Sequence, residues 1–202
     1  MNTQLHRHNL ISCISTSNGI KQGVVYLKGG SLTLRKWTDV ELPFRQESNF
    51  YYLTGVSEID ARLVIDISSC KAYLFVLNYD QDHQLWCGKT ASIKEMSEMY
   101  GLDVYYISEI NKVLGQIGSR KVYVLSKDDL SDDFKGWDVD DALLKFSLDQ
   151  VRVLKTKGEI GLMKEAARIT AIAHVQLMKN AKSFKNEGDG AALFHYECSR
   201  NG

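Results

Sequence analysis

The sequence predicts an α/β fold in which a mixed sheet is flanked by helices and followed by a helical segment. Segments 63–67 and 72–77 are nearly continuous apolar runs, which is typical of strands covered on both faces. After residue 156, apolar side chains recur at spacings of three and four residues, which indicates a long helix. The chain therefore divides into a sheet domain, residues 1–150, and a helical segment, residues 151–202.

Composition and charge are those of an ordinary globular protein. The chain has 202 residues, 44% of them hydrophobic, with 25 basic and 25 acidic side chains. A net charge of zero provides no bulk attraction to nucleic acid or to an anionic membrane, so we predict neither partner. No apolar run approaches the roughly 20 residues that span a bilayer, and the first residues lack the apolar core of a secretion signal. We therefore expect a cytoplasmic protein.

The four cysteines give no sign of a metal centre or a disulfide framework. Cys13, Cys70, Cys87 and Cys198 are scattered, and no two have the Cys-x-x-Cys spacing of a zinc ribbon. We predict that they are reduced and structural.

Apolar runs before residue 80 predict three strands, apart from the aromatic stretch described next. The first covers residues 23–27 and ends at Gly29 and Gly30. The apolar runs 63–67 and 72–77 are the next two, and the polar stretch 68–71 between them predicts a hairpin turn.

An unusual string lies between the first strand and the hairpin, at residues 44–55. A polar block at residues 45–49 runs directly into the aromatic stretch 50–53, which Gly55 closes. Aromatic residues are frequent in strands, so this stretch is interpreted as a buried strand that leaves through a tight turn.

Between residues 92 and 125 the pattern alternates between helix and strand. Apolar residues at helical spacing predict a helix over 92–99, with Gly101 as its stop. A strand at 104–107, a helix at 108–114 and a strand at 122–125 follow. This strand-helix-strand order is the order expected of an α/β domain with a mixed sheet.

The segment 127–141 is rich in aspartate, so a calcium loop has to be considered. Such a loop needs alternating oxygen donors, a glycine at its sharp turn and a closing glutamate. Here Gly136 stands directly before Trp137 and no glutamate closes the loop. A solvated loop whose aspartates cap helices is the favoured interpretation.

The helical segment begins with a clear start signal. Thr156 and Glu159 have the Thr-x-x-Glu spacing that satisfies free amide groups at a helix start. The apolar stripe then continues to Met178, a break is predicted at residues 186–190, and a short helix is predicted over 191–198.

Two of these strings resemble the aminopeptidase P and prolidase family of metallopeptidases. They are the string 44–55 and the string 152–160, and the likeness extends from about Tyr26 to Gly202. The resemblance implies that residues 1–150 have the fold of the family's N-terminal domain. It also implies that residues 151–202 are the incomplete start of the creatinase-like, pita-bread catalytic domain. The choice between a dipeptidase and an aminopeptidase stays open.

The resemblance implies a hydrolase that cleaves the peptide bond preceding proline. In the family, two divalent metal ions, usually manganese, are held by two Asp, one His and two Glu. Two metal ions bridged by hydroxide supply a nucleophile near neutral pH and polarise the scissile carbonyl. All five ligands lie beyond the family's second catalytic-domain helix. We therefore expect no metal in this chain, no catalytic residue and no activity of the chain alone.

One loop of the resemblance carries candidate substrate-binding residues. The sequence around residues 82–89 resembles a prolidase loop whose tryptophan crosses a dimer interface and lines the partner's active site, and Trp86 matches it. An indole is a rigid apolar wall that can pack against a proline ring. His83 matches the same loop. The alternatives are that Trp86 fills a core or an interface and that His83 is a surface histidine.

The remaining histidines are interpreted as structural. His6 and His8 lie in a terminus that we expect to be mobile, where an accidental pair is favoured over a metal site. His174 falls on the apolar stripe and is expected to be a hydrogen-bonded core residue. His195 and Cys198 are three residues apart, and packing is favoured over a shared metal.

Arg45 opens the polar block of the string 44–55. It can be interpreted as a carboxylate-binding arginine, but its place before a buried segment favours a structural ion pair. No catalytic role is therefore predicted for it.

Two hypotheses about function follow. The favoured one is that the chain is the N-terminal portion of an Xaa-Pro dipeptidase or aminopeptidase that acts on proline-containing peptides, as a homodimer. The alternative is a non-catalytic dimerisation module that pairs with a full-length paralogue and donates Trp86. An apolar stripe left without the sheet it normally covers favours the first.

Overall fold

The computed structural model describes residues 2–202 and divides them into two compact units, residues 2–153 and residues 154–202. The first unit contains a sheet and the second contains two long helices. Each unit is described by itself below.

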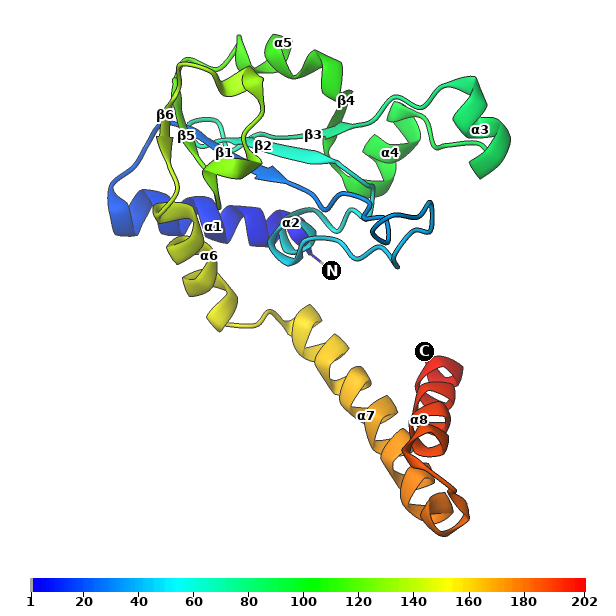
Figure 1. Ribbon diagram of the computed structural model, residues 1–202. Coiled ribbons are helices and arrows are strands. Elements are labelled where there is room, and N and C mark those ends of the chain that lie inside the picture. The colour runs from blue at the N-terminus through cyan, green and yellow to red at the C-terminus, as the bar shows by residue number, and fades with distance from the viewer. Residues whose placement is uncertain (1) are drawn as a thin grey trace. The chain divides into compact units, whose positions relative to one another are not determined.

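A six-stranded mixed sheet forms the centre of the first unit, with the strand order β4-β3-β2-β1-β5-β6 (Figure 1). Strands β1, β2 and β3 pair antiparallel, whereas β3 with β4, β1 with β5 and β5 with β6 pair parallel. The predicted mixed sheet is confirmed. The strands are β1 (Val24–Lys28), β2 (Arg62–Asp66), β3 (Ala72–Val76), β4 (Asp103–Tyr106), β5 (Lys121–Tyr123) and β6 (Asp138–Asp140).

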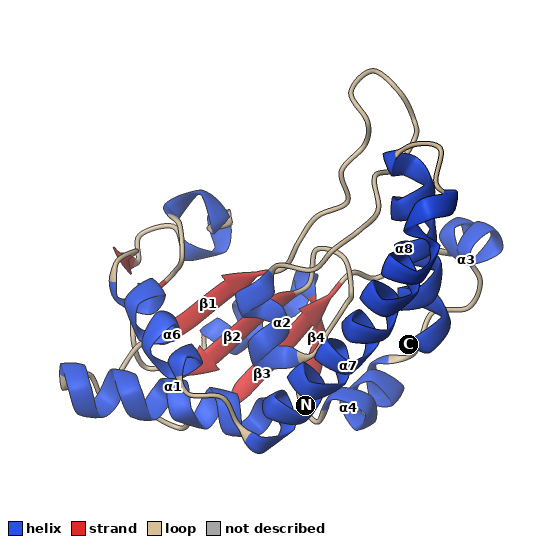
Figure 2. Cartoon of the chain, turned by 90° about the horizontal axis from the view of Figure 1, so that it is seen from below, coloured by secondary structure: helices blue, strands red, loops and turns tan. Residues whose placement is uncertain are grey.

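Helices and apolar side chains cover both faces of the sheet, as the continuous apolar strands predict. One face buries Leu27 and Leu63 together with four helices, which are α1 (Thr3–Asn18), α2 (Ser48–Thr54), α4 (Ile93–Tyr100) and α6 (Leu143–Val153). The other face buries Tyr26 and Val64 against α5 (Ile110–Leu114) and the short 3₁₀ turns before β6. Figure 2 shows the strands from the side of α1, α2, α4 and α6.

The hairpin and the helix-strand alternation are confirmed. The turn at residues 68–71 joins β2 to β3, and α4 ends at Gly101, which adopts a left-handed φ of 62°. Ser92 and Glu95 form a reciprocal capping box at the start of α4. Such caps fix the start of a helix because they satisfy its first free amide groups.

The aromatic stretch 50–53 is a helix, α2, and the predicted strand is wrong. A carboxylate oxygen of Glu47 accepts a hydrogen bond from the Phe50 amide at 2.6 Å, which starts the helix, and Gly55 ends it with a φ of 70°. Phe50 and Leu53 are buried three residues apart, while Tyr51 is exposed. Capping and helical spacing therefore outweigh the strand preference of aromatic residues.

The N-terminal segment is the ordered helix α1, and the expected mobile terminus is wrong. Leu10, Ile11 and Ile14 of α1 are buried in the core beneath the sheet. The sequence prediction also missed α6 and the short strand β6.

The second unit is a pair of packed helices, α7 (Lys157–Asn180) and α8 (Glu187–Asn201), joined by the 3₁₀ turn Ala181–Ser183. The predicted cap is present, because Thr156 and Glu159 form a capping box at the start of α7. The break lies earlier than predicted. Asn186 caps α8 through its side chain, so Gly188 and Gly190 lie inside the helix.

Most of the apolar stripe of α7 is exposed. Ala173 is the one buried residue among residues 157–180. His174 is exposed and meets Phe194 of α8 edge to face at 5.0 Å, so the prediction of a core histidine is wrong. Within residues 2–202, no helix is both long enough and apolar enough to span a membrane.

Candidate functional site

The two predicted substrate-binding residues lie on one short helix, α3 (Gln81–Cys87). Asp80 caps this helix by accepting a hydrogen bond from the His83 amide at 2.8 Å, and the Gly88 amide donates to the Gln84 carbonyl at its end. His83 and Trp86 are three residues apart, so they share one face of the helix. The sequence likens residues 82–89 to a loop, whereas in the structure most of this stretch belongs to a helix that carries both residues.

Trp86 does not fill a core of this chain. Its side chain is 86% exposed, its neighbour Leu85 is exposed as well, and no residue of α3 is buried. Two large apolar side chains therefore lie next to each other on the surface, where they are available to contact another molecule. The interpretation of Trp86 as a core residue is therefore wrong.

His83 is held by a neighbouring aromatic ring. Its imidazole stacks on Tyr79 with ring centroids 3.9 Å apart. Burial, together with the negative charges of Glu58 and Asp60, raises the pKa of Tyr79, which keeps its phenol neutral. The stack fixes the orientation of His83 near the start of α3.

A small cavity of about 220 Å³ lies at the base of α3. Tyr79, Gln84, Ile93 and Tyr106 are among the residues that line it. Neither His83 nor Trp86 is among the lining residues of this cavity.

The string 44–55 has a structural role, because Gln46 links three backbone segments by hydrogen bonds. The side-chain oxygen of Gln46 accepts hydrogen bonds from the amides of Gly30, at 2.6 Å, and Glu47, at 2.9 Å. Its side-chain nitrogen donates to the Glu58 carbonyl at 2.9 Å. A Cβ on Gly29 would lie 2.9 Å from the Ala61 carbonyl, so the backbone here is closely packed.

Arg152, at the start of the string 152–160, contacts two residues of the string 44–55. Its guanidinium donates a hydrogen bond to the Asn49 side chain and lies 5.3 Å from the ring of Tyr52. Arg45 is exposed and forms no ion pair with any residue in the range 2–202, so the predicted ion pair is wrong.

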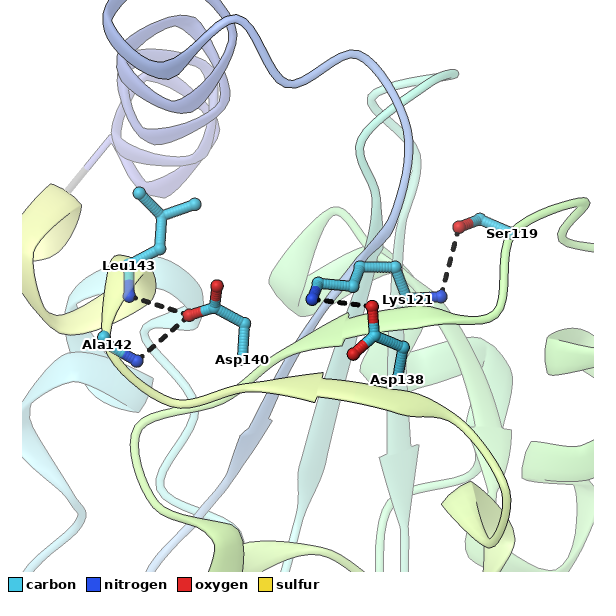
Figure 3. A network of polar contacts seen from close by, with 6 residues as sticks. All are labelled: Ser119, Lys121, Asp138, Asp140, Ala142 and Leu143. Atoms are coloured by element: carbon cyan, nitrogen blue, oxygen red, sulfur yellow. Dashed lines mark hydrogen bonds and ion pairs between the residues drawn. The ribbon is translucent and has the colours of Figure 1, made fainter.

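The aspartates of segment 127–141 are distributed over different partners. Asp133 pairs with Arg62 at 3.3 Å, and Asp138 pairs with Lys121 at 2.8 Å. Asp140 accepts hydrogen bonds from the amides of Ala142 and Leu143, each at 3.0 Å, which caps α6 (Figure 3). Lys121 donates a hydrogen bond from its ammonium group to Asp138, and this bond raises the pKa of Lys121. The carboxylates therefore act as caps and ion-pair partners.

The described residues do not fit a metal centre. Across residues 2–202, no three His, Cys, Asp or Glu side chains gather closely enough to hold an ion. His6 is buried, stacks on Tyr52 at 4.0 Å and meets its carbonyl through Nδ1 at 2.8 Å, whereas His8 is exposed. His195 is exposed and Cys198 is half-buried on α8. Cys70 and Cys87 are exposed, so they are not structural core residues.

Comparison with known families identifies the sheet unit. Residues 4–125, more than half of the chain, match the family described as aminopeptidase P, N-terminal domain. The chain belongs to the aminopeptidase P family. This confirms the resemblance carried by the string 44–55.

Curated relatives of the aminopeptidase P family match nearly the whole chain. A probable Xaa-Pro aminopeptidase of Talaromyces marneffei is 31% identical over 98% of this chain and 43% of its own length. A probable Xaa-Pro aminopeptidase of Paracoccidioides lutzii is 31% identical over 98% of this chain and 44% of its own. The chain thus spans less than half the length of these relatives.

Solved aminopeptidase P structures have the same fold. Escherichia coli aminopeptidase P superposes with a TM-score of 0.82 at 23% identity, over 100% of this chain and 50% of that one. The Pseudomonas aeruginosa enzyme gives a TM-score of 0.78 at 24% identity, again over 50% of its length. The predicted fold class, a mixed α/β sheet with flanking helices of the aminopeptidase P type, is confirmed.

Proposed function

We propose that this chain is the N-terminal, non-catalytic portion of a metal-dependent peptidase that hydrolyses the bond preceding proline. The observation that carries the proposal is the match of 98% of the chain to 43% of a probable Xaa-Pro aminopeptidase. In this proposal the substrates are proline-containing peptides, the enzyme is a cytoplasmic homodimer, and two divalent ions, manganese by preference, are held by residues outside this chain.

The absence of a metal cluster among residues 2–202 supports the assignment of chemistry to segments outside this chain. A hydrolytic site with two metal ions needs several converging carboxylate and imidazole ligands. The aspartates of this chain instead cap helices or pair with cations. This part then contributes structure and surface to the enzyme, and residues outside it contribute the nucleophile.

The helical unit supports a role as the start of the catalytic domain. Its helices expose apolar side chains along most of their length: Ile160, Leu162, Met163, Val175, Met178 and Tyr196. An apolar surface of this kind favours a covering layer. We assign that layer to the catalytic sheet, with the domain boundary near residues 150–151.

We assign Trp86 and His83 to substrate binding across the dimer interface. The exposed indole would form an apolar wall for the proline ring, which has no amide proton to be recognised by hydrogen bonding. Replacing Trp86 by Ala in the catalytically complete protein should raise KM for an Xaa-Pro substrate about 10-fold, since lost apolar contact weakens binding. Trp86→Phe, which keeps a ring, should retain most of the affinity. An unchanged KM in Trp86→Ala would remove the assignment.

The alternative is a dimerisation module that pairs with a full-length paralogue. The exposed pair Leu85 and Trp86 favours a partner surface in either case. Reading the transcript beyond the codon for Gly202 separates the two. An open frame that continues into segments rich in Asp, His and Glu supports the enzyme, and a stop codon there supports the module.

A hydrolysis assay tests the missing chemistry directly. The 202-residue chain mixed with manganese and a dipeptide ending in proline should give no turnover. Turnover by this chain alone, abolished by a chelator, would contradict the assignment of the metal ligands to segments outside it.

A further inference from the structure

A cavity of about 450 Å³ lies in the sheet unit, away from α3. One side of it is formed by α1, through Gln4, Arg7, His8 and Ile11, which share one helical face by their spacing. The turn between β2 and β3 and the junction of α4 with β4 complete the cavity. None of these residues takes part in the proposed substrate binding.

Among residues 2–202, Arg7 has no counter-ion, although it is a buried cation that lines this cavity. Its side chain is 8% exposed, and one hydrogen bond, from Nη1 to the Leu53 carbonyl at 2.7 Å, is formed within residues 2–202. A guanidinium has five N–H groups, so most of its donors are left for the cavity. Burial lowers the pKa of Arg7, and no carboxylate acts against that shift. A buried charge without a partner is destabilising unless something else pairs with it.

A second cation lies at the same cavity. Lys71 lines it and forms no ion pair within the described part of the chain. The first turn of α1 has no acidic residue, so the positive end of its dipole is not neutralised. Asp103 is the one carboxylate of the lining.

We propose that this cavity binds a small organic acid, whose oxyanion group, a carboxylate or a phosphate, pairs with Arg7 and Lys71. Ile11 and Leu102 supply apolar walls for the body of the ligand. The planar fork of an arginine matches two oxygens of such a group at once. Asp103 disfavours a ligand with several negative charges, because like charges repel across a small cavity.

A titration of the 202-residue chain tests the proposal by following the Arg7 Nε–H signal in a nitrogen-proton NMR spectrum. The probes are sodium isobutyrate, inorganic phosphate and the neutral amide isobutyramide. We expect a saturable shift with at least one anion and a Kd of about 1 mM, as two charge-assisted hydrogen bonds would give. Saturation by isobutyrate alone assigns a carboxylate ligand, and saturation by phosphate alone assigns a phosphate ligand.

Variants decide whether the cavity is responsible. Lys71→Gln should weaken binding about 3-fold to 10-fold, whereas Lys94→Gln, the same change on the exposed surface of α4 outside the lining, should leave the Kd unchanged. Arg7 is buried, so replacing it can also destabilise the fold, whereas Lys71 is exposed and its replacement avoids this complication. Arg7→Lys keeps the charge and loses the fork, and should weaken binding about 10-fold. Absence of saturation by both anions, equal binding of isobutyramide, or equal loss in the two lysine variants would overturn the proposal.

Discussion

The two units of this protein bury their apolar side chains in different ways. In the sheet unit, residues 2–153, both faces of β2 are covered, and Leu63, Val64 and Ile65 have no exposed surface. In the helical unit, residues 154–202, α7 has 24 residues and buries Ala173 alone. The first unit completes its own core, while the second leaves much of its apolar surface exposed.

This difference shows where each unit obtains its stability. A helix in a folded protein owes most of its stability to the packing of its apolar face, so α7 and α8 are held mainly by each other and by their caps. The sheet unit has two separate apolar clusters, one on each face. The cavity beside Arg7 is lined by elements of this packed unit, whereas α3, which has no buried residue, lies at its surface.

The largest expected effect is the contrast between a matched pair of leucines. Leu63→Ala on β2 should lower the free energy of unfolding by about 2–5 kcal/mol, because it opens a cavity in a fully buried site. Leu162→Ala on α7, where the side chain is 60% exposed, should change it by about 0.5 kcal/mol or less. Urea unfolding followed by circular dichroism measures both.

The comparison of Leu63→Ala with Leu162→Ala can also contradict the difference between the two units. A loss of comparable size in Leu162→Ala would mean that the surface of α7 is covered in solution, either by a second copy of the chain or by another layer. Sedimentation of the variant and of the unchanged chain at several concentrations would then identify a second copy.

Local signals in the sequence predict those elements that local hydrogen bonds decide. The spacing of Thr156 and Glu159 marks the start of α7, and Gly101 marks the end of α4. The polar stretch 68–71 predicts the hairpin. In each case the interacting residues are neighbours in the chain, so their effect can be predicted without the rest of the fold.

Other features depend on residues that are distant in sequence. The buried stripe of α1 is defined by the sheet it covers, whereas its position at the chain terminus predicts mobility. The stretch 50–53 became a helix because the cap from Glu47 and the core selected it over a strand. The cavity beside Arg7 is formed by three separate segments, so no motif in the sequence indicates it.

Of the candidate site, the sequence predicted the residues but not their setting. The resemblance indicates Trp86 and His83, and the structure adds the exposed helix that carries them and the stack of His83 on Tyr79. Exposure of an indole is decided by which surfaces the rest of the chain leaves uncovered, and a local pattern does not contain that information.

Two equivalent helix caps give a smaller and more local test of the contrast. Ser92→Ala and Thr156→Ala each remove the hydroxyl that accepts an amide hydrogen bond, from Glu95 and Glu159 respectively, both at 3.3 Å. Each loss should cost about 1 kcal/mol of helix stability. In the sheet unit we expect a lower midpoint of urea unfolding. In the helical unit we expect faster hydrogen exchange in the first turns of α7 with an unchanged midpoint. A shifted midpoint in Thr156→Ala would show that the units unfold together.

The smallest expected effect is an acid sensitivity that belongs to the sheet unit. Burial of Asp66 acts to raise its pKa, but hydrogen bonds from Ser69 and Ser68 outweigh it, so the pKa of this carboxyl is lowered in the folded chain. A lowered pKa stabilises the fold at pH values above the unfolded pKa of about 3.9, and this stabilisation is lost as the pH falls through the folded pKa.

Asp66→Asn should therefore flatten the dependence of unfolding free energy on pH in the acid range, measured by urea unfolding at a series of pH values. Asp39→Asn, at an exposed aspartate whose side chain makes no hydrogen bond within the described residues, is the matched control and should keep the slope of the unchanged chain. If both variants give the same slope, the turn at residues 68–71 does not hold the Asp66 carboxylate in solution. The acid response would then have to come from other carboxylates of the sheet unit, such as Glu95, whose pKa is lowered by the hydrogen bonds from Ser92.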